Sequence, residues 1–338
     1  MGGRPISGRP DYTTQMHRSL RTVLGAVLGA LLLAGTVRAE ILVLGYTDVA
    51  GPGYNHLEEI PERGSATNVA FVNFEENWTT TDLPTLLRDF QTSGLRAALI
   101  LDHLLFKRFP AVSSSCRDAQ GLFATRLRAN WRNRLARFAE AYGARVTPAT
   151  TRFLVVQTEV NNICVPLDDV EAAAVALKAA FPGIPLVMGY GRSLGAQPAP
   201  ESIPPDIDWV GFYKYGIFDP AQPGYSQNAD DQYLVEFESL LAKLDAHQRV
   251  LLGPDAFWAD PVHGHLYGQS GPGSGWPRWY LRYVALNYER FAKTQPKVVG
   301  MFFFRWSNRD PDIVGTVDLP PVVRDAHREI GCRNLGCR

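Results

Sequence analysis

Eight short apolar runs recur along this chain, and each ends in a polar or aromatic residue. They occupy residues 41–46, 68–74, 96–102, 153–159, 184–190, 207–213, 249–255 and 297–304. Near-continuous apolar runs of this length predict strands that are buried on both faces. If the eight strands are parallel, their polar ends converge on one rim, and that rim is where an active site is expected.

Stretches with helical spacing lie between most of the runs. The clearest, residues 125–142, places one apolar stripe at intervals of three and four, consisting of Leu127, Trp131, Leu135, Phe138 and Tyr142. Further helices are predicted at residues 83–90, 167–181, 230–247 and 279–294. The connection 191–206 carries four prolines and no helical period, so we expect the fifth helix to be missing or reduced.

This alternation of strands and helices predicts parallel strands joined by right-handed crossovers. Eight such units favour closure into a single-domain α/β fold, the (β/α)8 TIM barrel. An open doubly wound sheet that binds a dinucleotide is disfavoured, because no Gly-x-Gly-x-x-Gly turn follows the first run.

The first 39 residues read as a cleavable secretory signal, with Met16 as a possible true start. Arg18 and Arg21 precede an apolar stretch at 23–33, and Val37 and Ala39 supply small residues at the third-last and last positions before the cleavage site. A membrane anchor is the competing interpretation, but the apolar stretch is about half of the ~20 residues needed to span a bilayer. We therefore expect a secreted or periplasmic protein with no membrane span after cleavage. Residues 40–325 would form the barrel, and 326–338 a short tail.

Charge and cysteine content limit the classes of partner and ligand that are expected for this chain. The 34 basic and 34 acidic residues balance, so the chain offers no basic surface of the kind that nucleic acid requires. Four cysteines in an exported chain predict disulfides, which we expect between Cys116 and Cys164 and between Cys332 and Cys337. Zinc is the alternative, but no histidine lies at ligand spacing near either pair. No metal or cofactor is expected.

Glu159 is the leading catalytic candidate. It ends the fourth run, and Asn161 and Asn162 follow it closely. A carboxyl at a strand end among apolar neighbours can have its pKa raised enough to act as a general acid near neutral pH. The structural alternative is a glutamate paired with a rim arginine.

Glycoside hydrolysis needs a second carboxylate, and we expect Asp255, at the end of the seventh run, to supply it. The alternative is that Asp255 only stabilises a turn, because Pro-Asp pairs are common in turns. Other acids compete for a catalytic or substrate-binding role, and they are Asp48, Glu75, Glu76 and Asp102.

The remaining rim residues resemble a lining rather than a reaction centre. Aromatic rings cover the apolar face of a sugar, amides bind hydroxyls, and basic groups hold hydroxyls or carboxylates. The predicted lining consists of Tyr46, Asn161, Tyr190, Tyr213, Lys214, Trp258, Arg305 and Trp306. Taken singly, each residue of these types belongs to a core more often than to a cleft.

The chain resembles the clan of retaining, cellulase-like glycoside hydrolases built on (β/α)8 barrels. The resemblance rests on Glu159 with its asparagines, on the aromatic end of the run 207–213, and on the residues Phe-Phe-Arg-Trp-Ser at 303–307. It implies that Glu159 is the acid/base and that Trp306 is the floor under the reactive sugar.

Two departures from the clan's pattern stand out. Thr158 occupies the position where the clan has an asparagine before its glutamate, and Asp255 occupies the position of the glutamate nucleophile. An aspartate is one methylene shorter, which sets its carboxyl back by about 1.5 Å and moves the pair from retaining toward inverting separations.

The sequence therefore predicts an exported glycosidase that cleaves an oligo- or polysaccharide with two carboxylates. The alternative is a non-catalytic polysaccharide-binding or cell-envelope barrel that has lost its nucleophile. The sugar, its linkage and the oligomeric state are left open.

Overall fold

The computed structural model describes residues 40–51, 53–60, 66–75, 82–111, 116–118, 121–191, 202–213, 227–258, 278–308 and 313–337. Eight parallel strands form its centre, and each corresponds to one of the apolar runs. In barrel order they are β1 (Val43–Gly51), β3 (Val69–Asn73), β4 (Arg96–Ile100), β8 (Thr151–Gln157), β9 (Leu186–Gly191), β10 (Trp209–Tyr213), β11 (Arg249–Leu252) and β13 (Val298–Phe303). Pairing of β1 with β13 closes the ring, which confirms the predicted (β/α)8 barrel.

The barrel interior is filled by one cluster of apolar side chains. Alternate residues of each strand point inward, because side chains of a strand alternate between its faces. The ring of Phe71 packs in this cluster, with ring centroids 5.4 Å from Phe153 and 5.1 Å from Phe302. The other members of the interior cluster are Val43, Val69, Ala98, Ile100, Val155, Val187 and Leu251. The barrel is therefore a packed core, and chemistry is confined to its ends.

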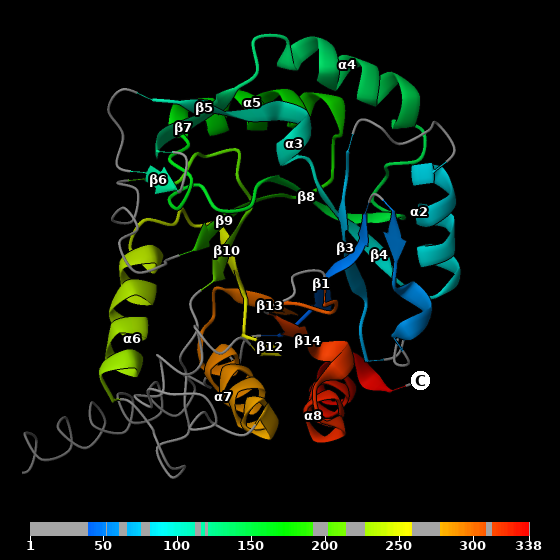
Figure 1. The fold of residues 1–338 in the computed structure, drawn as a ribbon, viewed down its shortest axis with the longest axis vertical. Helices are drawn as coiled ribbons and strands as arrows, with labels where there is room; N and C mark the ends of the chain where they lie inside the picture. The colour runs from blue at the N-terminus through cyan, green and yellow to red at the C-terminus, as the bar shows by residue number, and fades with distance from the viewer. Residues whose placement is uncertain are drawn as a thin grey trace, which may run out of the picture. The chain divides into compact units, whose positions relative to one another are not determined.

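Helices surround the ring of strands (Figure 1). They are α2 (Asp82–Thr92), α3 (Asp102–Leu105), α4 (Trp131–Tyr142), α5 (Leu167–Ala180), α6 (Gln227–Leu241), α7 (Leu281–Thr294) and α8 (Pro321–Gly331). All five predicted helices are present. The one predicted at residues 125–142 begins only at Trp131, because residues 121–127 belong to a strand. Most of the proline-rich connection expected to lack a helix lies outside the described residues.

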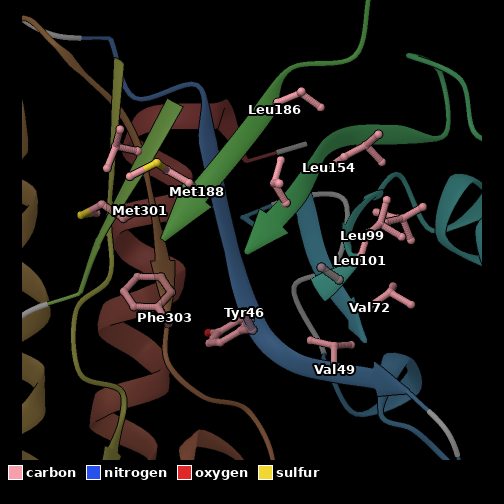
Figure 2. Packing of buried hydrophobic residues seen from close by; sticks show 14 of the residues in the cluster. Tyr46, Val49, Val72, Leu99, Leu101, Leu154, Leu186, Met188, Met301 and Phe303 are labelled. Atoms are coloured by element: carbon pink, nitrogen blue, oxygen red, sulfur yellow. The ribbon is translucent and has the colours of Figure 1, made fainter. Parts of the chain in front are cut away.

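A second apolar layer lies between the strands of the barrel and the helices that surround them. Figure 2 shows this layer, in which Tyr46, Leu99, Leu154, Met188 and Phe303 all belong to one buried cluster. These residues lie on the faces of their strands that point away from the barrel axis. Burial of such a layer is the main favourable contribution to folding.

A small antiparallel sheet interrupts the regular alternation after β4. It consists of β5 (Phe106–Pro110), β7 (Gly121–Leu127) and β6 (Cys116–Asp118), in that order. The apolar pattern of the sequence does not predict this sheet. Short pairs also join β2 (Tyr54–Asn55) to β1 and β12 (Phe257–Trp258) to β14 (Val314–Gly315).

Both predicted disulfides are present. Cys116 in β6 is bonded to Cys164, which lies beyond β8, with 5.9 Å between their Cα atoms. Cys332 is bonded to Cys337 in the π-helical turn 332–336 that continues α8. The first bond therefore ties the small sheet to the segment that follows Glu159.

The predicted signal at residues 1–39 lies outside the described residues. Within the described part of the chain, no helix is long and apolar enough to cross a membrane.

Candidate active site

Glu159 lies two residues beyond the end of β8, on the rim where the carboxyl ends of the strands meet. The Nδ2 of Asn162 donates a hydrogen bond of 3.3 Å to its Oε2. Burial raises the pKa of the Glu159 carboxyl, the hydrogen bond from Asn162 opposes that rise, and the negative charge of Asp102 adds to it. Burial has the largest effect, so the net shift is upward and favours the protonated acid.

Asp102 provides a second carboxyl group on the neighbouring strand. It follows β4, which pairs with β8 through Ile100 and Val155. The hydroxyl of Thr158 donates a hydrogen bond of 3.0 Å to its Oδ2, and the backbone N–H of His103 donates one of 2.7 Å to its Oδ1. Thr158, the residue directly before Glu159, therefore links the Asp102 carboxylate to the segment that carries Glu159.

Tyr213 forms the floor beside these two carboxyls. Its ring lies edge-on to Phe302, with centroids 4.9 Å apart, at the top of the interior cluster. Burial, together with the charges of Glu159 and Asp102, raises the pKa of its hydroxyl well above the usual value. The hydroxyl is therefore a hydrogen-bond donor at neutral pH, and its ring offers an apolar face beside the acids.

Glycines make room for Tyr213. A Cβ atom at Gly189 would lie 2.6 Å from the Tyr213 ring and 1.7 Å from the carbonyl oxygen of Thr158. At Gly211 the three closest atoms to an added Cβ all belong to Tyr213, the first at 2.8 Å. Real Cβ atoms do not approach so closely, so strands β9 and β10 can carry only glycine beneath this ring.

Asn161 holds the loop rather than facing a substrate in this structure. Its Oδ1 accepts a hydrogen bond of 3.1 Å from the backbone N–H of Gly191, and its Nδ2 donates to the carbonyl of the same residue. Both ends of the buried amide are thus engaged with the end of β9. Together with the disulfide at Cys164, this contact fixes the segment that carries Glu159 and Asn162.

A second polar cluster lies at the ends of β1 and β13. Asp48 is nearly buried and has a φ angle of 57°, in the left-handed region that few residues other than glycine adopt. Its carboxylate accepts hydrogen bonds from the hydroxyls of Tyr54, at 2.8 Å, and Ser307. Arg305 lies 3.9 Å away as an ion-pair partner. In the barrel order, β13 lies four strands from β8 in either direction, so this cluster and Glu159 occupy opposite sides of the rim.

Asp255 lies beyond β11 with a fully buried side chain. It bridges Phe304 in the register of parallel strands, and its charge raises the pKa of Tyr233 on α6. Asp102, and not Asp255, is the carboxylate whose charge acts on Glu159. The structure thus groups Asp102 with Glu159 and groups Asp255 with the helical layer.

Four predicted lining residues are buried. Tyr46 and Trp306 are fully buried and pack against each other with ring centroids 4.8 Å apart. Tyr190 stacks on Phe212 within the outer layer. Trp258 is 5% exposed and belongs to strand β12. These rings pack within the barrel wall, and their role in binding a sugar stays a prediction.

Glu75 lies partly exposed two residues beyond β3. Glu76 and Lys214, also predicted to bind substrate, lie outside the described residues. Thr158, Tyr54 and Ser307 were not predicted. No feature of the sequence pointed to Tyr54. Ser307 entered only as the last residue of the segment 303–307, and Thr158 only as a departure from the clan's pattern.

No group of three or more histidine, cysteine, aspartate or glutamate side chains that could hold a metal occurs among the described residues. The site therefore consists of carboxyl, amide, hydroxyl and aromatic groups, which can transfer protons and bind hydroxyls.

Comparison with known proteins supports the fold. No family model matches the sequence, and no curated protein matches it. Among solved structures, a GH113 β-1,4-mannanase is similar with a TM-score of 0.55 at 11% identity, covering 87% of this chain and 99% of the mannanase. A β-glucuronidase of Ruminococcus gnavus has a TM-score of 0.53 at 8% identity, covering 86% of this chain and 50% of that one. The chain thus has the (β/α)8 barrel that these glycoside hydrolases also have.

Proposed function

We propose that this protein hydrolyses a glycosidic bond in an oligo- or polysaccharide, with Glu159 as the general acid. The environment of the Glu159 carboxyl carries the proposal. The Glu159 side chain lies on the rim formed by the carboxyl ends of the strands. Burial and the charge of Asp102 raise its pKa, and it lies close to the ring of Tyr213. These are the properties of a general acid that stays protonated near neutral pH and contacts a sugar ring.

The chemistry follows from the charges. A leaving sugar oxygen needs a proton as its bond to the anomeric carbon breaks, and protonated Glu159 supplies that proton. A second carboxyl then stabilises the positive charge that develops on the sugar ring, or activates the water that attacks the anomeric carbon. The water loses a proton to a carboxylate, so the net reaction adds one water across the glycosidic bond.

Asp102 and Asp255 are the two candidates for the second carboxyl. The mutual orientation of Asp102, Thr158 and Glu159 favours Asp102, because the Thr158 hydroxyl fixes the Asp102 carboxylate beside the acid. Complete burial of Asp255 weighs against contact with a substrate. The Asp255 assignment remains a prediction from the clan resemblance.

A panel of polysaccharides, read by release of reducing ends, tests the function. The wild type is expected to cleave at least one substrate. On that substrate, Glu159→Gln should reduce kcat by a factor of about 10² to 10⁴, the usual contribution of general acid–base catalysis. Asp102→Asn should cause a comparable loss, whereas Asp255→Asn should change activity only as far as it changes stability. Full activity of Glu159→Gln would refute the assignment.

A non-catalytic polysaccharide-binding barrel is the second candidate. The buried position of Asp255 favours it, because among the described residues that follow β11 the one carboxylate is then withdrawn from the surface of the rim. Saturable binding of a polysaccharide by the wild type, with no reducing ends released over long incubation, would support this alternative.

Export belongs to the proposal as well. Two disulfides suit an oxidising compartment, and the leader-like sequence of residues 1–39 would direct the chain there. Mass spectrometry of the mature protein, with an expected N-terminus at Glu40, tests cleavage.

A further inference from the structure

Two pairs of basic side chains lie at the end of the barrel opposite Glu159, Arg96 with Arg152 and Arg249 with Lys297. Arg96 is the first residue of β4, Arg152 the second of β8 and Arg249 the first of β11, and Lys297 directly precedes β13. Each is partly buried. They lie at the amino ends of parallel strands, which meet at one face of a barrel just as the carboxyl ends meet at the other.

Trp209 lies beside Arg152. The guanidinium carbon of Arg152 lies 5.6 Å from the centroid of the Trp209 ring. Trp209 is the first residue of β10 and pairs in register with Arg249 on β11. Within each pair the two cations are close enough to repel each other. Burial lowers the pKa of Arg152, and the charge of Arg96 lowers it further. Burial also lowers the pKa of Lys297, and the charge of Arg249 adds to that effect.

Little negative charge compensates the two pairs. Arg96 donates to the carbonyl oxygen of Pro148 at 3.3 Å, and Arg249 and Lys297 donate to the carbonyl oxygen of Ala246 at 2.8 and 3.1 Å. The exposed Asp245 raises the pKa of Lys297, but among the described residues no carboxylate forms an ion pair with any of the four.

The Nε of Arg152 is buried and has no hydrogen-bond partner. A guanidinium that lies over an aromatic ring keeps the N–H donors along its edge available. A buried donor without an acceptor is costly, and most such groups in proteins are satisfied by protein, water or ligand. Arg152 thus presents donors, and Arg96 adds charge on the adjacent strand.

We propose that the amino-end face of the barrel binds a phosphate or other tetrahedral oxyanion between Arg96 and Arg152. Such an anion accepts paired N–H bonds from an arginine fork and carries up to two negative charges, so it would relieve the repulsion between neighbouring cations. The site is separate from the Glu159 rim, and it does not depend on the proposed hydrolysis.

Thermal unfolding and calorimetry with inorganic phosphate test the site in the full-length mature protein. Phosphate is compared with chloride at equal ionic strength, because nonspecific screening affects both. We expect phosphate to raise the Tm of the wild type and to bind with a Kd that is about tenfold weaker in Arg152→Gln and in Arg96→Gln. Arg152→Lys keeps a positive charge over Trp209 but loses the planar fork, and it should weaken binding while preserving the fold.

Arg88→Gln is the matched control. Arg88 lies on α2, its side chain is 69% exposed, and it belongs to neither pair. Equal phosphate stabilisation in the wild type and in both arginine variants would overturn the proposal, as would a wild-type response no larger than that to chloride.

The source of the phosphate group can be separated in the same series. Cosedimentation with phosphatidylglycerol vesicles that is lost in Arg152→Gln would identify a lipid headgroup as a ligand. Binding of inorganic phosphate without cosedimentation would identify a free anion. Either result supports the site.

Discussion

The hydroxyl of Tyr46 and the Nδ1 of His327 lie within hydrogen-bond distance, 3.1 Å, although 281 residues separate them in the chain. His327 is buried and its ring stacks on Phe303 with centroids 3.9 Å apart. The contact joins β1 to α8 beside the seam between β1 and β13, where the barrel closes. A neutral imidazole is required there, because its surroundings offer no solvent to a charged one.

Stability should therefore fall with acid through His327. Burial lowers its pKa from 6.5 to about 3. Below pH 6.5 the unfolded chain binds a proton that the folded chain does not, so this contribution is complete above pH 6.5 and is lost as the pH falls toward 3. The slope is at most about 1.4 kcal/mol per pH unit.

Urea unfolding between pH 7 and pH 4 measures this slope. His327→Gln should flatten it, whereas His103→Gln, at a side chain that is 69% exposed, should leave it unchanged. The same slope in the wild type and in His327→Gln would contradict the assignment.

The two neighbours of Glu159 should shift its titration in opposite directions. Asn162→Ala removes a hydrogen bond that lowers the pKa of Glu159, so that pKa should rise. Asp102→Asn removes a negative charge that raises it, so the pKa should fall. Because a general acid works while protonated, the alkaline limb of kcat/KM should move up in the first variant and down in the second. Carboxyl NMR titration gives the same readout without a substrate, and shifts of the same sign would argue against this electrostatic picture.

The two disulfides should contribute unequally to stability. Cys116 and Cys164 are 48 residues apart, and the chain-entropy model assigns a loop of that length about 4 kcal/mol. Cys332 and Cys337 are 5 residues apart, for which the same model gives about 2 kcal/mol. Paired serine variants compared by urea unfolding measure the difference. A larger loss from the 332/337 pair would mean that constraint of the unfolded chain is not the main effect.

Glycine substitutions beneath Tyr213 should separate side-chain from backbone clashes. At Gly211 the three atoms nearest to an added methyl group all belong to Tyr213, so Gly211→Ala should cost about 1–3 kcal/mol. Much of that loss should disappear when Tyr213→Ala is added. At Gly189 the methyl group meets the carbonyl of Thr158, and removal of the tyrosine should not rescue Gly189→Ala. A double-mutant cycle by chemical unfolding tests both expectations, and equal rescue at both positions would contradict them.

The sequence was sufficient to predict the barrel, all eight strands and both disulfides. Long apolar runs report burial on both faces, and that is the property a closed parallel barrel demands. The small sheet after β4 was missed because its strands carry mixed polar residues on a surface insertion, where burial leaves little pattern.

The sequence was less informative about which strand-end side chains meet at the rim. Successive residues of a strand point to opposite faces, and one irregularity in register reverses the assignment. Register shifts occur in β1 after Tyr46 and in β8 between Val155 and Gln157. Tyr190 and Tyr213 both end apolar runs, yet one packs into the outer layer and the other lies over the barrel interior. Gly189 on β9 and Gly211 on β10, which leave room for the ring of Tyr213, are the signal that could have distinguished them.

The ring of Tyr213 separates two parts of the molecule that have different constraints. Below it, side-chain volumes must match as in a crystal, and most exchanges there would disturb the whole barrel. Above it, groups such as Asp102 and Asn162 come from the segments that follow the strands, and their replacement need not alter the packing underneath. The same scaffold can therefore accept a different set of rim residues, so a change of substrate in this protein would require redesign of those segments and not of its core.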